Sequence, residues 1–107
     1  MNDITSRELK ERIDAGTAPV MIDVREPHEW DRQHLDGVKT ISLSTIPAHL
    51  PELEALKGEE VVLICRSGGR SGQATQFLRS KGFSNARNLI GGMLGWKAEI
   101  DPEFDVD

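Results

Sequence analysis

The sequence predicts an α/β fold in which helices flank a mostly parallel sheet. Short apolar segments typical of buried strands alternate along the chain with segments that carry helix signals. Strands that alternate with helices are typical of βαβ units, whose strands pair in parallel. The chain has 107 residues, which suffices for one hydrophobic core without disulfides or metal. We therefore expect residues 1–107 to form a single domain.

The first helix is expected to begin at a capping box in residues 5–8 and to end near Gly16. A second, short helix is expected to begin at Pro27, because proline suits the first helical turn. The expected strands are apolar runs bounded by turn or helix-starting residues. They are residues 20–24, 39–43, 61–64 and 85–90.

From residue 47 onward the chain is expected to contain a loop, three helical segments and a frayed tail. Pro47 and Pro51 bracket an expected loop, and one or two helical turns follow at residues 52–56. The remaining expected helices are residues 71–81 and 92–100. The tail, residues 101–107, is acidic, and we expect it to be frayed.

The composition predicts a soluble cytoplasmic protein without a metal or other cofactor. One cysteine excludes an intrachain disulfide, and there is no CxxC pair or Cys/His cluster typical of structural zinc. A free, reactive thiol is most easily kept reduced in the cytoplasm. The N-terminus lacks a signal-peptide pattern, and the apolar runs are too short to span a bilayer.

Charge is distributed unevenly along the chain, although the net charge is only −5. Residues 1–60 carry 13 acidic and 7 basic side chains, whereas residues 61–98 carry six basic side chains and no acidic one. The second segment contains Cys65, and a locally cationic surface there would attract small anions. Nucleic acid is a poorer match, because the whole chain is acidic and only 5% of its residues are aromatic.

Cys65 stands between the expected strand at 61–64 and a glycine-rich turn. The residues that follow it are Arg66, Ser67, Gly68, Gly69, Arg70 and Ser71. A strand, a tight turn and a helix N-terminus let several backbone N–H groups converge on one point. These amides and two guanidinium groups would stabilise a thiolate and lower the cysteine pKa below its ordinary value of about 8.5. The pattern predicts that Cys65 is an activated nucleophile whose two neighbouring arginines bind an anion.

Structural roles explain some of these residues equally well. A lone cysteine is often a packing residue, but no core requires the arginines and glycines that follow Cys65. Ser67 and Ser71 are expected to donate hydrogen bonds into the loop, and Ser71 is equally suited to cap the following helix. Asp23 and Arg25 stand at the matching end of another expected strand, where we expect them to brace the cleft, for example by pairing with each other.

Four blocks of the sequence together resemble the signatures of rhodanese-like domains, the thiosulfate sulfurtransferase family. They are IDVREPHEW at 22–30, HLDGV at 34–38 with Ile41, CRSGGRS at 65–71 and GGMLGW at 91–96. The resemblance spans about residues 4–100. It departs from the family pattern at Gln33, where glycine usually precedes the histidine.

The resemblance implies a five-stranded, largely parallel sheet and sulfurtransferase chemistry. Cys65 would take a sulfane sulfur from thiosulfate or another persulfide donor, hold it as a persulfide and pass it to cyanide or a thiol. The loop from Arg66 to Ser71 would bind this small anionic donor, and Arg70, the last residue of the six-residue loop, would help to select it. Thioredoxin and glutathione are thiol acceptors that suit this chemistry.

Two alternative functions remain open. Rhodanese-like domains also serve as non-enzymatic binding or sulfur-carrier modules, and binding modules commonly lack the cysteine that this chain has. Related phosphatases and arsenate reductases resemble Cys-x5-Arg, a loop wide enough for a tetrahedral oxyanion, whereas Cys65 and Arg70 have Cys-x4-Arg spacing. The shorter loop leaves less room for phosphate, and no general acid for a leaving group lies within it. We therefore favour a sulfurtransferase.

Overall fold

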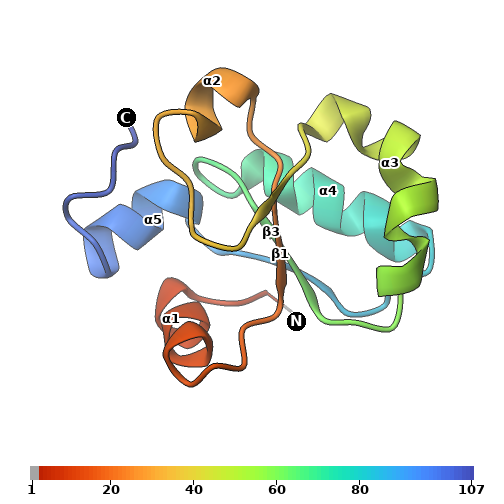
Figure 1. Cartoon of the computed structure of the whole chain (residues 1–107), viewed down its shortest axis with the longest axis horizontal. Helices are drawn as coiled ribbons and strands as arrows, with labels where there is room; N and C mark the ends of the chain where they lie inside the picture. The colour runs from red at the N-terminus through yellow and green to blue at the C-terminus, as the bar shows by residue number, and fades with distance from the viewer. Residues whose placement is uncertain (1–2) are drawn as a thin grey trace.

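The computed structural model describes residues 3–107 and centres on a parallel sheet (Figure 1). Within these residues the sheet has four strands, in the spatial order β2–β1–β3–β4. Their bounds are β1 Val20–Asp23, β2 Lys39–Thr40, β3 Val61–Ile64 and β4 Ala86–Asn88. All three neighbouring pairs are parallel. The prediction of an α/β fold with a parallel sheet is therefore confirmed.

The fifth strand that the resemblance implies is reduced to one bridge. Ile4 pairs in parallel with Leu89, just beyond the end of β4. Its N–H donates to the Asn88 carbonyl at 2.9 Å, and its carbonyl accepts from the Ile90 N–H at 2.9 Å. Thr5 already caps the first helix, so the chain leaves the sheet before a second pair can form. Within the described residues the expectation of five strands is wrong by this one edge position.

Helices cover both faces of the sheet. Their bounds are α1 Ser6–Asp14, α2 Pro27–Trp30, α3 Ile46–Leu53, α4 Gly69–Ser80 and α5 Gly92–Glu99, with 3-10 turns η1 Leu43–Thr45 and η2 Glu54–Leu56. Helices α3 and α4 pack on one face, α1 and α5 on the other, and α2 follows the carboxyl end of β1 (Figure 1). The predicted capping box of α1 is present. No helix within residues 3–107 is long and apolar enough to cross a membrane.

The alternation of side chains along β3 determines the direction of Cys65. Val61 and Leu63 belong to the core cluster on the α3 and α4 side, whereas Val62 and Ile64 belong to the cluster on the α1 and α5 side. Successive side chains of a strand point to opposite faces. Cys65, directly after β3, therefore points to the face that α4 covers, and it packs in that cluster.

The strands predicted at 39–43 and 85–90 are shorter in the structure, where β2 ends at Thr40 and β4 covers Ala86–Asn88. Two further segments differ from the sequence prediction. The expected loop between Pro47 and Pro51 is the helix α3, because Pro47 lies in the first turn, where its missing N–H has no role. The tail is packed rather than frayed. Phe104 and Val106, which are 1% and 9% exposed, join the core cluster that also contains Trp96. Burial of this apolar pair offsets the mutual repulsion of the acidic residues around it.

Candidate active site

The carboxyl ends of β1 and β3 meet at one edge of the sheet. Asp23, the last residue of β1, is in register with Ile64, the last residue of β3. The next residue along, Val24, donates its N–H to the Ile64 carbonyl at 2.8 Å. Arg25 and Cys65 therefore emerge from adjacent strands at the same edge. Open parallel sheets bind their ligands at this edge.

The residues after Cys65 form a tight turn that leads directly into α4. Gly68 has a φ of +105°, a left-handed conformation that glycine adopts without strain. Its N–H donates to the Cys65 Sγ at 3.0 Å. Helix α4 begins at Gly69, two residues earlier than predicted, and its cap is Gly68. Ser71 is thus not a cap; its hydroxyl donates to the Cys65 Sγ at 3.2 Å.

Hydrogen bonds favour the thiolate form of Cys65. The residue is 1% exposed, and burial by itself raises the pKa of the thiol. The Ser71 hydroxyl and the backbone N–H groups of Ser71, Gly68 and Ser67 lower that pKa by hydrogen bonding to the sulfur. Their combined effect outweighs burial, so the pKa of Cys65 lies below its ordinary value. This is the direction that the sequence predicts.

The N-terminus of α5 holds the backbone of the loop in place. The Met93 N–H donates to the Cys65 carbonyl and the Leu94 N–H to the Arg66 carbonyl, each at 2.9 Å. This close approach requires glycine at position 92, where φ is +57° and a Cβ atom would lie 2.7 Å from the carbonyl carbon of Arg66. The GGMLGW block at 91–96 therefore acts on the loop through its backbone.

Asn88 is a part of the site that the sequence analysis missed. The Ser71 hydroxyl donates to Asn88 Oδ1 at 2.5 Å, and Asn88 Nδ2 donates to the Gly68 carbonyl at 3.1 Å. Asn88 therefore holds two of the residues that donate to the Cys65 Sγ, Ser71 and Gly68. The Ser71 hydroxyl has a single hydrogen, so the Cys65 sulfur and the Asn88 oxygen share it. The sequence feature that could have identified Asn88 is a polar residue at the carboxyl end of β4, the strand next to β3.

Asp23 and Arg25 form a buried ion pair, with each side chain 1% exposed. Arg25 Nη2 donates to Asp23 Oδ2 at 2.8 Å, and Nε donates to Oδ1 at 2.9 Å. Arg25 Nη2 also donates to the carbonyl of Gln33 at 2.7 Å. The two side chains are thus occupied with each other, as expected, and with the turn before His34; that they brace the cleft stays a prediction.

Arg70 is held by a carboxylate that lies far from it in the sequence. Its Nη1 and Nη2 donate to the two carboxylate oxygens of Glu29 on α2, at 2.7 and 2.8 Å. These hydrogen bonds outweigh the effect of burial and, with the N–H of Glu26, lower the pKa of Glu29 to about 2. Glu29 therefore stays ionised at any ordinary pH. It lies within the 22–30 block, but its spacing from Arg70 in the sequence gave no sign of the contact.

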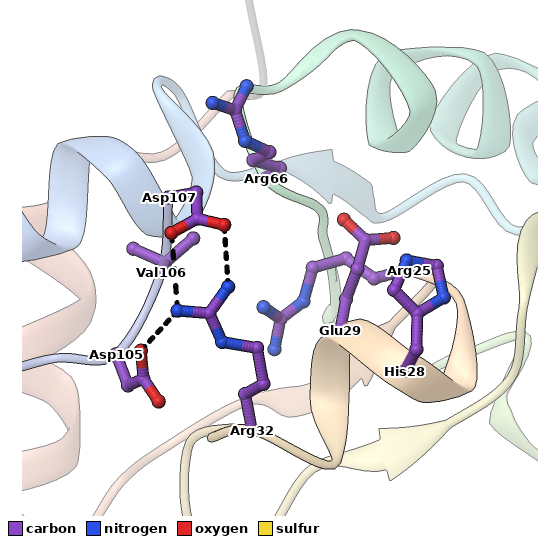
Figure 2. Close-up of a pocket in the computed structure, with 8 residues that line it drawn as sticks. All are labelled: Arg25, His28, Glu29, Arg32, Arg66, Asp105, Val106 and Asp107. Carbon is purple, nitrogen blue, oxygen red and sulfur yellow. Dashed lines mark hydrogen bonds and ion pairs between the residues drawn. The ribbon is translucent and has the colours of Figure 1, made fainter.

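A pocket of about 170 Å³ opens beside the loop, between α2 and the C-terminal tail (Figure 2). Its lining is rich in charged groups of both signs: Arg25, His28, Glu29, Arg32, Arg66, Asp105, Val106 and Asp107. Figure 2 shows the Arg32 guanidinium between the carboxylates of Asp105 and Asp107, at 2.5 and 2.7 Å. Of the two loop arginines, Arg66 lines this pocket, whereas Arg70 does not.

The structure brings the predicted residues together at the carboxyl edge of the sheet. Cys65, Gly68 and Ser71 are in direct contact, Gly69 begins α4, and the side chain of Ser67 faces solvent. Within residues 3–107, no group of three or more His, Cys, Asp or Glu side chains is placed to hold a metal ion. A thiolate surrounded by inward-pointing N–H groups can attack an electrophilic atom and stabilise an anion formed there.

The fold and the site define an α/β protein with a buried cysteine whose sulfur accepts hydrogen bonds within an amide-lined loop. Residues 5–99 match the family described as rhodanese-like domain, and the chain belongs to this family. It is 39% identical over 108 residues to the Zea mays protein named adenylyltransferase and sulfurtransferase MOCS3-2, covering 96% of this chain and 22% of that protein. The chain thus spans about a fifth of this longer relative.

Two further similarities concern shorter proteins. The chain is 29% identical to the putative sulfur carrier protein YrkF of Bacillus subtilis, covering 92% of this chain and 52% of that protein. The structure superposes on the human single-domain sulfurtransferase TSTD1 with a TM-score of 0.78 and 27% identity, covering 92% of this chain and 97% of that one. Its rhodanese-like homologues are thus sulfurtransferases or sulfur carriers.

Proposed function

We propose that this protein is a sulfurtransferase that moves a sulfane sulfur from thiosulfate or another persulfide donor through a Cys65 persulfide. The observation that supports this most directly is the pair of hydrogen bonds to Cys65 Sγ, from Gly68 N–H at 3.0 Å and Ser71 Oγ at 3.2 Å. They stabilise the thiolate, which is the nucleophilic form of cysteine.

In the proposed reaction the Cys65 thiolate attacks the sulfane sulfur of thiosulfate. A new S–S bond forms to Cys65, the S–S bond of thiosulfate breaks, and sulfite leaves with the electron pair of that bond. Sulfite leaves as a stable anion, so the step needs no general acid. The terminal sulfur of the persulfide then carries the negative charge, which the inward-pointing N–H groups of the loop would stabilise.

The second half of the reaction transfers this sulfur to a thiophilic acceptor. A cyanide ion or a thiolate attacks the terminal sulfur, and the Cys65 thiolate leaves. Arg66 and Arg70 are the two arginines of the loop itself, and we assign to them the binding of the anionic part of the donor. A thiol such as thioredoxin or glutathione in the cytoplasm, where Cys65 would stay reduced, fits the acceptor role.

A sulfur carrier is the second candidate, supported by the similarity to a protein named as one. Both candidates form the same Cys65 persulfide and differ in the acceptor that takes its sulfur. An enzyme releases its sulfur to a small acceptor and turns over many times, whereas a carrier discharges only to a partner protein. Repeated turnover with thiosulfate and cyanide distinguishes them.

Incubation with thiosulfate followed by intact-mass spectrometry tests the proposal. We expect a mass increase of one sulfur atom, reversed by cyanide with formation of thiocyanate or by dithiothreitol. Cys65→Ser, which replaces the sulfur by a weaker nucleophile of similar shape, should abolish both. Thiocyanate formation by Cys65→Ser at the native rate would overturn the assignment.

A further inference from the structure

The ion pair between Arg70 and Glu29 bears on which donor the loop accepts. Both oxygens of the Glu29 carboxylate accept from Arg70, and one of them also accepts from the Glu26 N–H at 2.9 Å. Glu29 is the third residue of α2, and its side chain caps the N-terminus of this helix by accepting from the N–H of Glu26, the N-cap residue. The Arg70 and Glu29 side chains are 34% and 18% exposed, respectively, so water screens the pair only in part.

Most of the positive charge around the loop is compensated in the same way. Arg25 pairs with Asp23, and Arg32 pairs with Asp105 and Asp107 of the tail. Among the residues that the structure describes, Arg66 is the arginine of the pocket that forms no ion pair. The mouth of the site is therefore less cationic than the sequence of 61–98 by itself indicates.

We propose that Glu29 is a donor-specificity residue that disfavours doubly charged oxyanion donors such as thiosulfate and leaves organic persulfides as the preferred donors. This inference rests on the proposed sulfurtransferase function and refines it. The class of donor is defined by its chemistry: a sulfane sulfur bonded to the sulfur of an organic thiol, without a sulfonate group.

The physical argument compares what each donor meets beside Cys65. The sulfonate of thiosulfate gains little from Arg70 unless it displaces or shares the Glu29 carboxylate. In either case the thiosulfate dianion lies close to a carboxylate that stays ionised. Like charges at short range in a partly buried site repel strongly. An organic persulfide has no sulfonate to place there. It presents its terminal sulfur to the Cys65 thiolate, which attacks it, and the thiolate of the donor leaves.

Glu29→Gln is the variant that separates charge from shape. Glutamine can still accept from the Glu26 N–H, so the start of α2 is retained, and α2 buries no residue whose packing would be lost. Glu11→Gln, on the exposed side of α1, makes the same change of net charge away from the site. Glu29→Ala is the second variant, and circular dichroism verifies the fold of each protein.

Sulfate, an unreactive dianion, gives a binding measurement that does not depend on sulfur transfer. Its concentration for half-protection of Cys65 against iodoacetamide is measured at constant ionic strength, held with sodium chloride. Release of Arg70 for a charge-assisted contact should lower this concentration by about tenfold in Glu29→Gln. Glu11→Gln should match the wild type, and Glu29→Gln combined with Arg70→Ala should lose the gain.

The donor preference is then measured as kcat/KM. Glu29→Gln should raise kcat/KM for thiosulfate by about the same tenfold factor, mainly through KM, and should leave kcat/KM for cysteine persulfide within about twofold. Sulfate protection that is unchanged in both Glu29 variants, or an equal gain with both donors, would overturn the inference. Absence of transfer from either donor, with sulfate protection still improved, would instead refute the proposed function and leave the role of Glu29 in anion exclusion standing.

Discussion

Replacement of Ser71 by alanine tests how the loop activates Cys65. The hydroxyl of Ser71 is buried, lies 3.2 Å from the Cys65 Sγ and is the largest of the hydrogen-bonding influences that lower the pKa of Cys65. Alanine removes this donor and leaves the burial of the sulfur unchanged. The backbone N–H of residue 71 also remains, so the variant isolates the hydroxyl.

The expected size of the effect can be worked out from the geometry. A hydrogen bond to a charged group contributes about 1.5–3 kcal/mol, and one pKa unit corresponds to about 1.4 kcal/mol. Because Asn88 Oδ1 competes for the single hydroxyl hydrogen at 2.5 Å, we expect the lower end of this range. Ser71→Ala should therefore raise the pKa of Cys65, and at pH values below the wild-type pKa the alkylation rate should fall about tenfold.

The assay is the rate of iodoacetamide alkylation as a function of pH, followed by intact mass. The rate rises as the thiolate forms, and its midpoint reports the pKa of Cys65. Ser67→Ala is the matched control, because the side chain of Ser67 faces solvent and only its N–H lowers the Cys65 pKa. A Ser71→Ala midpoint equal to that of the wild type, or an equal rise in Ser67→Ala, would refute this account of activation.

Two further predictions concern the backbone of the loop and the tail. Gly92→Ala forces a Cβ atom against the Arg66 carbonyl at a residue whose φ is positive. We therefore expect the free energy of unfolding to fall by roughly 2 kcal/mol or more. Alkylation of the Cys65 thiol should also be slower. Gly58→Ala, with open space around it, should be near neutral in urea unfolding, and equal losses would contradict the steric argument. Phe104→Ala should lose about 3–5 kcal/mol, since Phe104 is 1% exposed, whereas Glu103→Ala on the exposed surface should change little. A Phe104 variant as stable as the Glu103 control would show that the tail does not pack.

The strand and helix order could be predicted from local patterns. Val61–Ile64 is a run of four β-formers before a glycine turn, and the structure has a strand over the same four residues. The capping box at Thr5 predicted the start of α1. Both signals lie within a few residues of the structure that they determine, because capping and turn conformations depend on the backbone and side chains of near neighbours.

The errors arose where contacts from distant residues decide the local structure. The tail 101–107 carries charges that predict fraying, but Phe104 packs in a core formed by side chains of α1, β3 and α5. The helix at Pro47 similarly buries Ile46 and Leu53 against the sheet. In each case burial of apolar side chains outweighs a local preference that the sequence displays.

The sequence by itself determined the fold class, the family and the loop of Cys65. Each can be predicted from short patterns of neighbouring residues, such as the run 61–64 and the block CRSGGRS at 65–71. Only the tertiary structure decided what surrounds that loop. Asn88 from β4 holds the donors of Cys65, and Glu29 from α2 compensates the charge of Arg70. Charges that are segregated along the sequence are thus interleaved on the surface, because folding brings the acidic first half of the chain against the basic loop. Electrostatic interactions depend on distance in space, so the balance of charge around Cys65 is a property of the folded protein.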